Sequence, residues 1–148
     1  MSNAVRVLTL AAFAAIAIGT SVYPDVSLLG LEPTEVIEEL GGPARVYVAR
    51  SKRVELASVV FFYDDFRYIY FHDNRVWQVR YDERSEEYVL GLPPNSSRRD
   101  VLYELGPAVY ENGESAVFEL GDHGFPVRVR AFFESDRLVD TYIYRADY

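Results

Sequence analysis

Two copies of one short motif constrain the fold of this chain more than any other feature. Residues 30–43 begin with Gly-Leu-Glu-Pro and end with Glu-Leu-Gly-Gly-Pro, and residues 91–107 begin with Gly-Leu-Pro-Pro and end with Glu-Leu-Gly-Pro. Aromatic and β-branched residues, which favour strands, follow each copy. We therefore predict an α+β fold of two tandem repeats, about 28–82 and 89–147. Each repeat would be a short helix or helix pair followed by an antiparallel sheet of about four strands, and the two sheets could join into one.

The first 21 residues have the pattern of an export signal. One positive charge, Arg6, precedes an apolar run from Val7 to Ile18, and small residues occupy positions 19–21. An apolar run of about 12 residues is short for a membrane-spanning helix, which needs about 20. We therefore expect a signal peptide over residues 1–21, with an uncleaved anchor as the alternative. Residues 22–148 would form one exported domain, in the periplasm or outside the cell.

The exported part of the chain is acidic and has no cysteine. All 23 Asp and Glu residues lie after residue 21, together with 14 of the 15 Lys and Arg residues, so the net charge there is 14 − 23 = −9. This charge repels phosphate backbones and argues against a nucleic-acid partner. Without cysteine the domain can form no disulfide and carry no lipid on a thiol. We expect no direct membrane insertion after signal cleavage.

A helix is predicted at each copy of the motif. Pro33 suits the first turn of the first helix, and residues 41–43 end it. Ser97 or its neighbours Asn95 and Ser96 can cap the second helix, which residues 106–107 end. The predicted apolar faces are Val36, Ile37 and Leu40 in the first helix and Val101, Leu102 and Leu105 in the second.

The sequence after each helix alternates between strand-like segments and turn residues. Asp73-Asn74 tolerates the positive φ of a tight hairpin turn, and the charged segment 81–88 is the predicted linker between the repeats. The predicted strands lie near residues 45–50, 57–63, 66–72 and 75–81 in the first repeat and near 108–111, 115–120, 126–133 and 138–145 in the second.

Alternation in the second repeat indicates which face of its sheet is buried. Valines at 127 and 129 alternate with Arg128, Arg130 and Phe132. Two unpaired arginines in a small core would cost several kcal/mol each, so the valines face inward. Asn74-Arg75-Val76 matches Asp136-Arg137-Leu138 at an offset of 62 residues, which transfers the assignment to the first repeat.

The transferred assignment predicts an aromatic outer face in the first repeat. Phe66, Tyr68 and Tyr70 would point outward, with Tyr70 directly opposite Trp77 across the hairpin. Phe71 and Val76 would point inward, and Val79 could join them only if a bulge intervenes. The candidate binding residues are therefore Phe66, Tyr68, Tyr70, Trp77, Arg128, Arg130 and Phe132, unless the linker, a loop or the other repeat covers this face.

The spacing of the motif resembles the unit of the SmpA/BamE-type outer-membrane assembly lipoproteins. Its tandem duplication resembles the secreted β-lactamase inhibitory proteins, whose two helix-plus-sheet repeats present a concave sheet to a partner enzyme. The resemblance implies a non-enzymatic, extracytoplasmic binding protein with the same fold. The matching residues are Glu35-Val36, Leu40-Gly41 and Pro43 in the first copy and Asp100-Val101 and Leu105-Gly106-Pro107 in the second.

Catalytic and metal signatures are weak in this sequence. His72 and His123 each stand beside an aspartate in a predicted turn, and a metal site needs at least a third ligand. Asp64-Asp65 is predicted to be a turn between two strands rather than half of a carboxylate pair. There is no Gly-x-Ser-x-Gly motif and no phosphate loop. We therefore expect that the protein is not an enzyme and that it binds no cofactor and no metal ion.

Tyr, Trp and Arg are the residue types that dominate binding hot spots, and all three occur on the predicted outer face. The main hypothesis is an exported module that binds a protein partner through this face. One alternative is a self-associating envelope protein that forms a homodimer. A small-ligand binder or an enzyme with an unrecognised site is the other.

Overall fold

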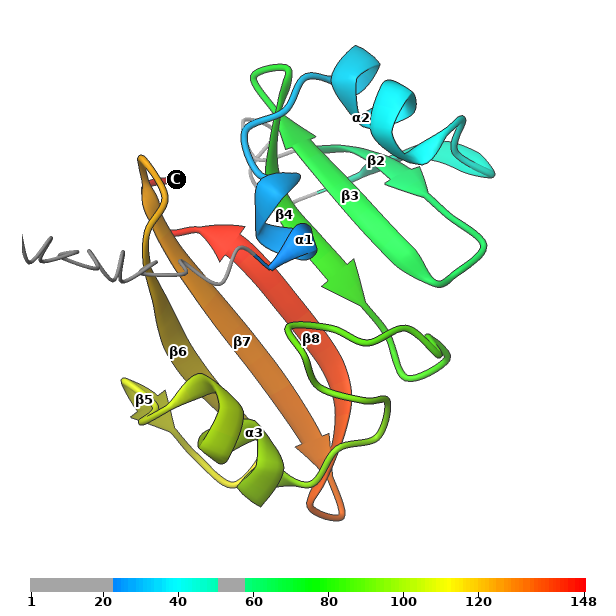
Figure 1. Cartoon of the computed structure of the whole chain (residues 1–148). Coiled ribbons are helices and arrows are strands. Elements are labelled where there is room, and N and C mark those ends of the chain that lie inside the picture. The colour runs from blue at the N-terminus through cyan, green and yellow to red at the C-terminus, as the bar shows by residue number, and fades with distance from the viewer. Residues whose placement is uncertain (1–22, 51–57) are drawn as a thin grey trace, which may run out of the picture.

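In the described part of the chain, one antiparallel sheet of eight strands is formed (Figure 1). The structure is a computed structural model that describes residues 23–50 and 58–148. The elements of the first half are α1 (Pro24–Ser27), α2 (Pro33–Leu40), β1 (Arg45–Ala49), β2 (Ser58–Phe62), β3 (Arg67–His72) and β4 (Arg75–Tyr81). Those of the second half are α3 (Arg98–Leu105), β5 (Tyr110–Glu111), β6 (Ser115–Asp122), β7 (Pro126–Glu134) and β8 (Arg137–Arg145).

The strand order joins the two halves at their last strands. The order is β1-β2-β3-β4-β8-β7-β6-β5, and β4 pairs with β8 through residues 78–81 and 141–144. The predicted α+β class is therefore confirmed, and the two predicted sheets form one. Strands β1 and β5 form the outer edges of the sheet among the described residues.

The helices form where the caps and the apolar spacing predict. Ser97 accepts a hydrogen bond from the backbone N–H of Asp100, and the Asp100 side chain accepts one from the backbone N–H of Ser97, which completes a capping box for α3. The Glu35 side chain accepts a hydrogen bond from the backbone N–H of Glu32 at the start of α2. Gly41 and Gly106 follow the two helices with φ of 82° and 84°, a region that glycine enters without strain.

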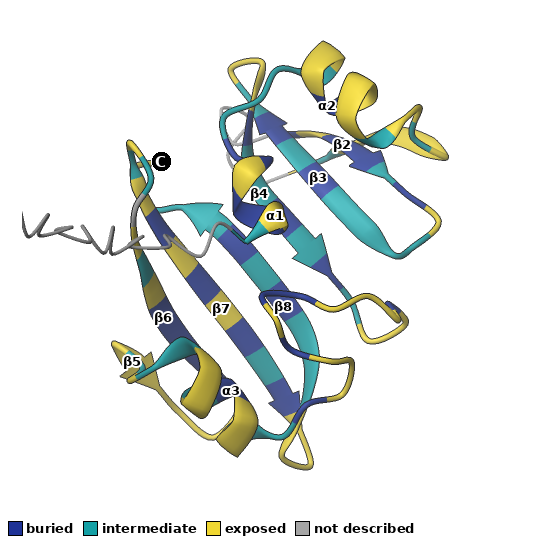
Figure 2. Ribbon diagram, in the orientation of Figure 1, coloured by how far each residue is buried: buried dark blue, intermediate teal, exposed yellow. Residues whose placement is uncertain are grey.

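Helices α1, α2 and α3 lie on one face of the sheet (Figure 1). Val36 of α2 and Val101 of α3 are fully buried against that face. A row of apolar side chains crosses six strands beneath the helices, so the core continues across the joint between β4 and β8 (Figure 2). In register order the row is Phe61, Ile69, Val79, Ile143, Val129 and Phe118.

Backbone features of the first half recur in the second. The predicted hairpin turn at Asp73-Asn74 has φ of 46° and 60°, and Ser135-Asp136, 62 residues later, has 47° and 64°. Trp77 forms a bulge in the ladder of β3 and β4, and Val139, again 62 residues later, forms one in the ladder of β7 and β8. Each half therefore uses the same turn and the same bulge at the same distance from it.

The backbone before each helix is tied to the sheet next to these bulges. The N–H of Val76 donates to the carbonyl of Leu31, and the N–H of Leu138 donates to the carbonyl of Ser96, both at 2.9 Å. Leu31 and Ser96 each stand directly before a helix N-cap. The two helices are thus held against the sheet by equivalent hydrogen bonds.

The predicted signal peptide, residues 1–21, lies outside the described residues. None of the helices in residues 23–50 and 58–148 combines the length and the hydropathy that crossing a membrane requires.

Candidate binding face

The side of the sheet that faces away from the helices forms the candidate site, and we call it the open face. Its side chains alternate with those of the core, as the burial pattern along β7 shows (Figure 2). The register places the following residues on it: Arg45, Tyr47, Ser58, Val60, Phe62, Tyr68, Tyr70, Trp77, Gln78, Arg80, Tyr110, Ser115, Val117, Glu119, Arg128, Arg130, Phe132, Asp140, Tyr142 and Tyr144.

Six of the seven residues predicted from the sequence lie on strands of this face. Tyr68 stands opposite Arg80 within the first half, and Arg130 stands opposite Tyr142 within the second. Arg80 of β4 in turn stands opposite Tyr142 of β8, so the register brings residues of both halves together at the β4–β8 joint. The valines between the arginines are buried, as predicted, with 1% of Val127 and 0% of Val129 exposed. Among the described residues, the helices and the buried linker residues Val89, Leu90 and Leu92 pack on the opposite, core side of the sheet.

Phe66, the seventh residue, is not part of a strand, so its predicted place on the sheet is wrong. It has a φ of 60° in the turn before β3, which begins one residue later at Arg67. The turn through Asp64 and Asp65 needs this extra residue to reverse the chain, and the Asp65 side chain accepts a hydrogen bond from the backbone N–H of Arg67. The Phe66 ring lies 6.3 Å from that of Phe62, at the border of the open face.

The predicted pairing of Tyr70 with Trp77 also needs a correction. Tyr70 stands opposite Gln78, because the bulge at Trp77 shifts the register by one residue. The same bulge allows Val76 and Val79 both to be fully buried, as the sequence required. Trp77 still lies beside Tyr70, with ring centroids 6.4 Å apart, and its indole N–H donates to Ser58 Oγ at 3.2 Å.

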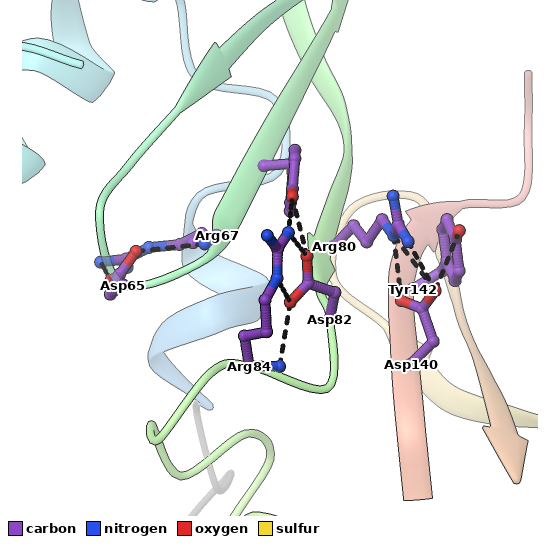
Figure 3. Close-up of polar contacts among 8 residues, drawn as sticks. Asp65, Arg67, Arg80, Asp82, Arg84, Asp140 and Tyr142 are labelled. Carbon is purple, nitrogen blue, oxygen red and sulfur yellow. Dashed lines mark hydrogen bonds and ion pairs between the residues drawn. The ribbon is translucent and has the colours of Figure 1, made fainter. Parts of the chain in front are cut away.

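An ion pair that the sequence did not predict joins the two halves on this face. Arg80 Nε lies 2.9 Å from Asp140 Oδ1, and Arg80 Nη2 lies 2.7 Å from Asp140 Oδ2 (Figure 3). The guanidinium also lies between the rings of Tyr68 and Tyr142, 5.1 and 5.2 Å from their centroids. Hydrogen bonding to Asp140 raises the pKa of Arg80, so the cation is held in place.

A second polar cluster closes the end of the face near β4. The Tyr68 hydroxyl donates to Asp82 Oδ2 at 2.7 Å. Arg84 contacts both groups, and Figure 3 shows its ion pair with Asp82. Burial and the hydrogen bond to Asp82 raise the pKa of Tyr68 to about 12. Burial alone would raise the pKa of Asp82, but hydrogen bonds from Arg84 and Tyr68 lower it to about 2. These groups are therefore fixed by their own contacts and are poor candidates for proton transfer at neutral pH.

Three adjoining hollows run across the open face. The first is lined by aromatic rings around Trp77, the second lies at the β4–β8 joint, and the third lies towards β5 and β6. Trp77 and Gln78 line both the first and the second, and Arg130, Phe132 and Tyr144 line both the second and the third. The first includes Ser58, Tyr70, His72 and Tyr148, the second includes Tyr142, and the third includes Tyr110, Ser115, Val117 and Arg128.

The two histidines have different surroundings. The side chain of His72 is 25% exposed, with Nε2 3.6 Å from Asp73 Oδ2, and its ring packs edge-on against Tyr148. His123 Nε2 lies 3.3 Å from the carbonyl oxygen of Leu120. Both are partly buried. In the described part of the chain no three His, Asp or Glu side chains converge on a point that could hold a metal ion.

Neither the known protein families nor the curated proteins include a match to this sequence. One solved structure is similar in fold, an extracellular protein containing an SCP domain from Bacillus anthracis strain Ames. The superposition has a TM-score of 0.55 at 11% sequence identity and covers 99% of this chain. The chain spans 51% of the length of that protein. At this identity the likeness concerns the fold alone.

Proposed function

We propose that this chain is an exported, non-enzymatic module that binds a protein partner on its open face. The observation that supports this most directly is the asymmetry of the sheet. Helices cover one face in the described structure, and the other presents aromatic and arginine side chains around adjoining hollows. These residue types bury large contact areas at low entropic cost and dominate protein-binding hot spots.

We further propose that the two halves are tandem repeats of one helix-plus-sheet unit. The turn and the bulge recur at an offset of 62 residues, and an equivalent hydrogen bond ties the start of each helix to the sheet, as expected of two copies of one unit. The resemblance to SmpA/BamE-type units and to β-lactamase inhibitory proteins fits this proposal, because the shared motif supplies the helix ends. The extracellular origin of the structural neighbour and the signal-like N-terminus favour a periplasmic or secreted location.

Capture from an envelope extract tests the binding face. The wild type, a Tyr70→Ala/Trp77→Ala variant and a Tyr103→Ala control would be immobilised under identical conditions. Tyr103 lies on α3, on the helix side, and is 90% exposed, so it offers a matched aromatic removal away from the open face. We expect proteins that the wild type and the control retain and the double variant loses.

The capture experiment also requires a check that the variants are folded. Circular dichroism must show the same fold in all three proteins, since Trp77 also donates a hydrogen bond to Ser58. If the double variant captures the same proteins as the wild type, the open face is not the binding surface and the proposal fails.

A second candidate function, self-association, is supported by the edge strand β1. Val46 and Val48 are each 58% exposed there and Tyr47 is 41% exposed, and no described strand pairs with the outer side of β1. Exposed apolar edge strands pair readily with other chains. A dimer in solution that Val48→Lys converts to a monomer would support pairing through β1. A dimer that only Trp77→Asp converts would place self-association on the open face, and a stable monomer would exclude both.

A further inference from the structure

Arg130 lies near the middle of the open face without a partner. It is exposed on β7, between Val117 of β6 and Tyr142 of β8 in the register. The neighbouring cations are neutralised, because Arg128 Nη2 lies 2.9 Å from Glu119 Oε1 and Arg80 is paired with Asp140. Among the described residues, no hydrogen bond or ion pair reaches the Arg130 guanidinium. Its five donors are therefore available to a ligand.

The charge of the open face is opposite in sign to that of the whole chain. Away from the hairpin turns at 73–74 and 135–136, the strands place the arginines at 45, 80, 128 and 130 on it, against the carboxylates of Glu119 and Asp140, which gives 4 − 2 = +2. A further arginine, Arg50, lines the hollow around Trp77. The whole chain carries −8. Most acidic residues lie on the helices and in the loops instead, as in α2 with Glu35, Glu38 and Glu39. A partner group of negative charge is therefore attracted to the open face and repelled by the opposite one.

The surroundings of Arg130 suit a single carboxylate better than a chain of phosphates. Aromatic rings of Trp77, Phe132, Tyr142 and Tyr144 line the hollow that Arg130 borders, and excluding water there strengthens a charge-assisted hydrogen bond. A phosphate polymer would need a row of free cations and would meet the repulsion of a chain with net charge −8. One Asp or Glu side chain meets only the local field.

On the proposed function above, we infer that the bound partner segment presents an aspartate or glutamate to Arg130 and an apolar or aromatic side chain to the adjoining hollow. That hollow is lined by Tyr70, His72 and Tyr148 and shares Trp77 with the one beside Arg130. The planar guanidinium binds a carboxylate through two parallel hydrogen bonds. The rings then bury the neighbouring apolar group and exclude water from the ion pair.

Selection from a displayed library of random short peptides tests this inference on the full chain. Peptides would be selected on the wild type, on Arg130→Gln, on Trp77→Ala and on Arg99→Gln. Arg99 is an exposed arginine of α3, on the helix side, and serves as the matched control. We expect peptides with an acidic residue close to an apolar or aromatic one from the wild type and the control. We expect no acidic enrichment with Arg130→Gln.

A double-mutant cycle then measures the contact itself. The most enriched peptide would be compared with a synthetic copy in which its Asp or Glu is replaced by Asn or Gln. We expect each single change, in the peptide or at Arg130, to weaken binding about tenfold, and the two together to weaken it no further. Arg99→Gln should bind both peptides as the wild type does.

The outcomes separate this inference from the proposed function. Selected peptides that require Trp77 but show no acidic preference would overturn the carboxylate assignment and leave the open face as a binding surface. Peptides that require neither Trp77 nor Arg130 would overturn both. Tighter Arg130-dependent binding of oligothymidylate or of phosphatidylglycerol vesicles than of any selected peptide would replace the carboxylate by a phosphate. A homodimer that Arg130→Gln dissociates would identify the occupant as a second copy.

Discussion

The two halves of the sheet share a backbone and differ in the side chains they expose. Both use a two-residue turn with positive φ, a bulge at the same distance from it, and a helix followed by glycine. On the open face, however, Tyr68 and Tyr70 of the first half correspond to Arg130 and Phe132 of the second. The helix-covered side, with its turns and bulges, is therefore the part of the sheet that determines the fold. The open side could then change without altering the fold.

The largest effect is expected from a substitution that tests whether the halves fold as one unit. Ile143 is fully buried on β8 and stands between Val79 of the first half and Val129 of the second. Ile143→Ala should lower the free energy of unfolding by about 2–5 kcal/mol, because it leaves a cavity in the shared core. Urea unfolding, followed by circular dichroism and by the fluorescence of Trp77, the single tryptophan, measures this change.

The position of the tryptophan makes the measurement specific. Trp77 belongs to the first half and Ile143 to the second, so a common core shifts both signals together. If Ile143→Ala shifts the circular dichroism but not the fluorescence transition, the halves unfold separately. Val109→Ala, at a site 55% exposed, should leave both transitions nearly unchanged.

A smaller effect is expected from the ion pair that links the halves on the open face. Asp140→Ala removes the carboxylate that accepts hydrogen bonds from Arg80, whose side chain is only 27% exposed, and should cost about 1–3 kcal/mol. Glu119→Ala is the matched control within the second half, because its pair with Arg128 is exposed and contributes about 0–1 kcal/mol. Equal losses of unfolding free energy in the two variants would show that the Arg80–Asp140 pair contributes no more to stability than an exposed ion pair does.

The sequence predicted the local structure of both halves closely, because local chemistry determines it. Pro33, Gly41 and Ser97 mark helix ends through their own conformational limits and side-chain oxygens, and both helices begin and end beside them. Asp73-Asn74 predicted a turn with positive φ, and it has one. The inward valines of β7 followed from the cost of burying unpaired arginines, and this prediction is also confirmed.

The sequence predicted less of the open face, because that face depends on which strands are neighbours. Arg80, Tyr142 and Tyr144 were missed, since the bulge at Trp77 reverses the alternation in β4 and the β4–β8 pairing brings together strands about 60 residues apart. The buried Ile143 between two tyrosines is the signal that could have placed β8 correctly. Phe66 was placed on a strand because its parity matches Tyr68, although the turn extends one residue further than expected.

The N-caps of α2 and α3 can be compared by substitution, with expected losses of unfolding free energy of about 1 kcal/mol or less. Ser97→Ala removes the side-chain oxygen that accepts the Asp100 backbone N–H and should destabilise the protein by about 1 kcal/mol. Glu32→Ala at the equivalent position of α2 should cost less, because glutamate is a poor cap and its pair with Arg75 is largely exposed. Urea unfolding midpoints would measure both. A larger loss for Glu32→Ala would show that α2, not α3, depends more on its cap.

The smallest expected effect is the pH dependence of the cluster around Tyr68, which has no counterpart at the equivalent Arg130. The pKa of Asp82 is lowered to about 2 from an ordinary value of 3.8, so the folded state favours its charged form. That stabilisation is complete above about pH 4 and is lost as the pH falls towards 2. Solvent screening limits it to about 1 kcal/mol or less.

Asp82→Asn isolates this contribution, because asparagine does not titrate and the other carboxylates are common to both proteins. The variant should be less stable than the wild type near neutral pH, and the difference in unfolding free energy should shrink between about pH 4 and pH 2. Urea unfolding at several pH values gives that difference directly. If it stays constant across this range, Asp82 titrates normally in the folded state. The hydrogen bonds from Arg84 and Tyr68 would then contribute nothing to stability through the charge of Asp82.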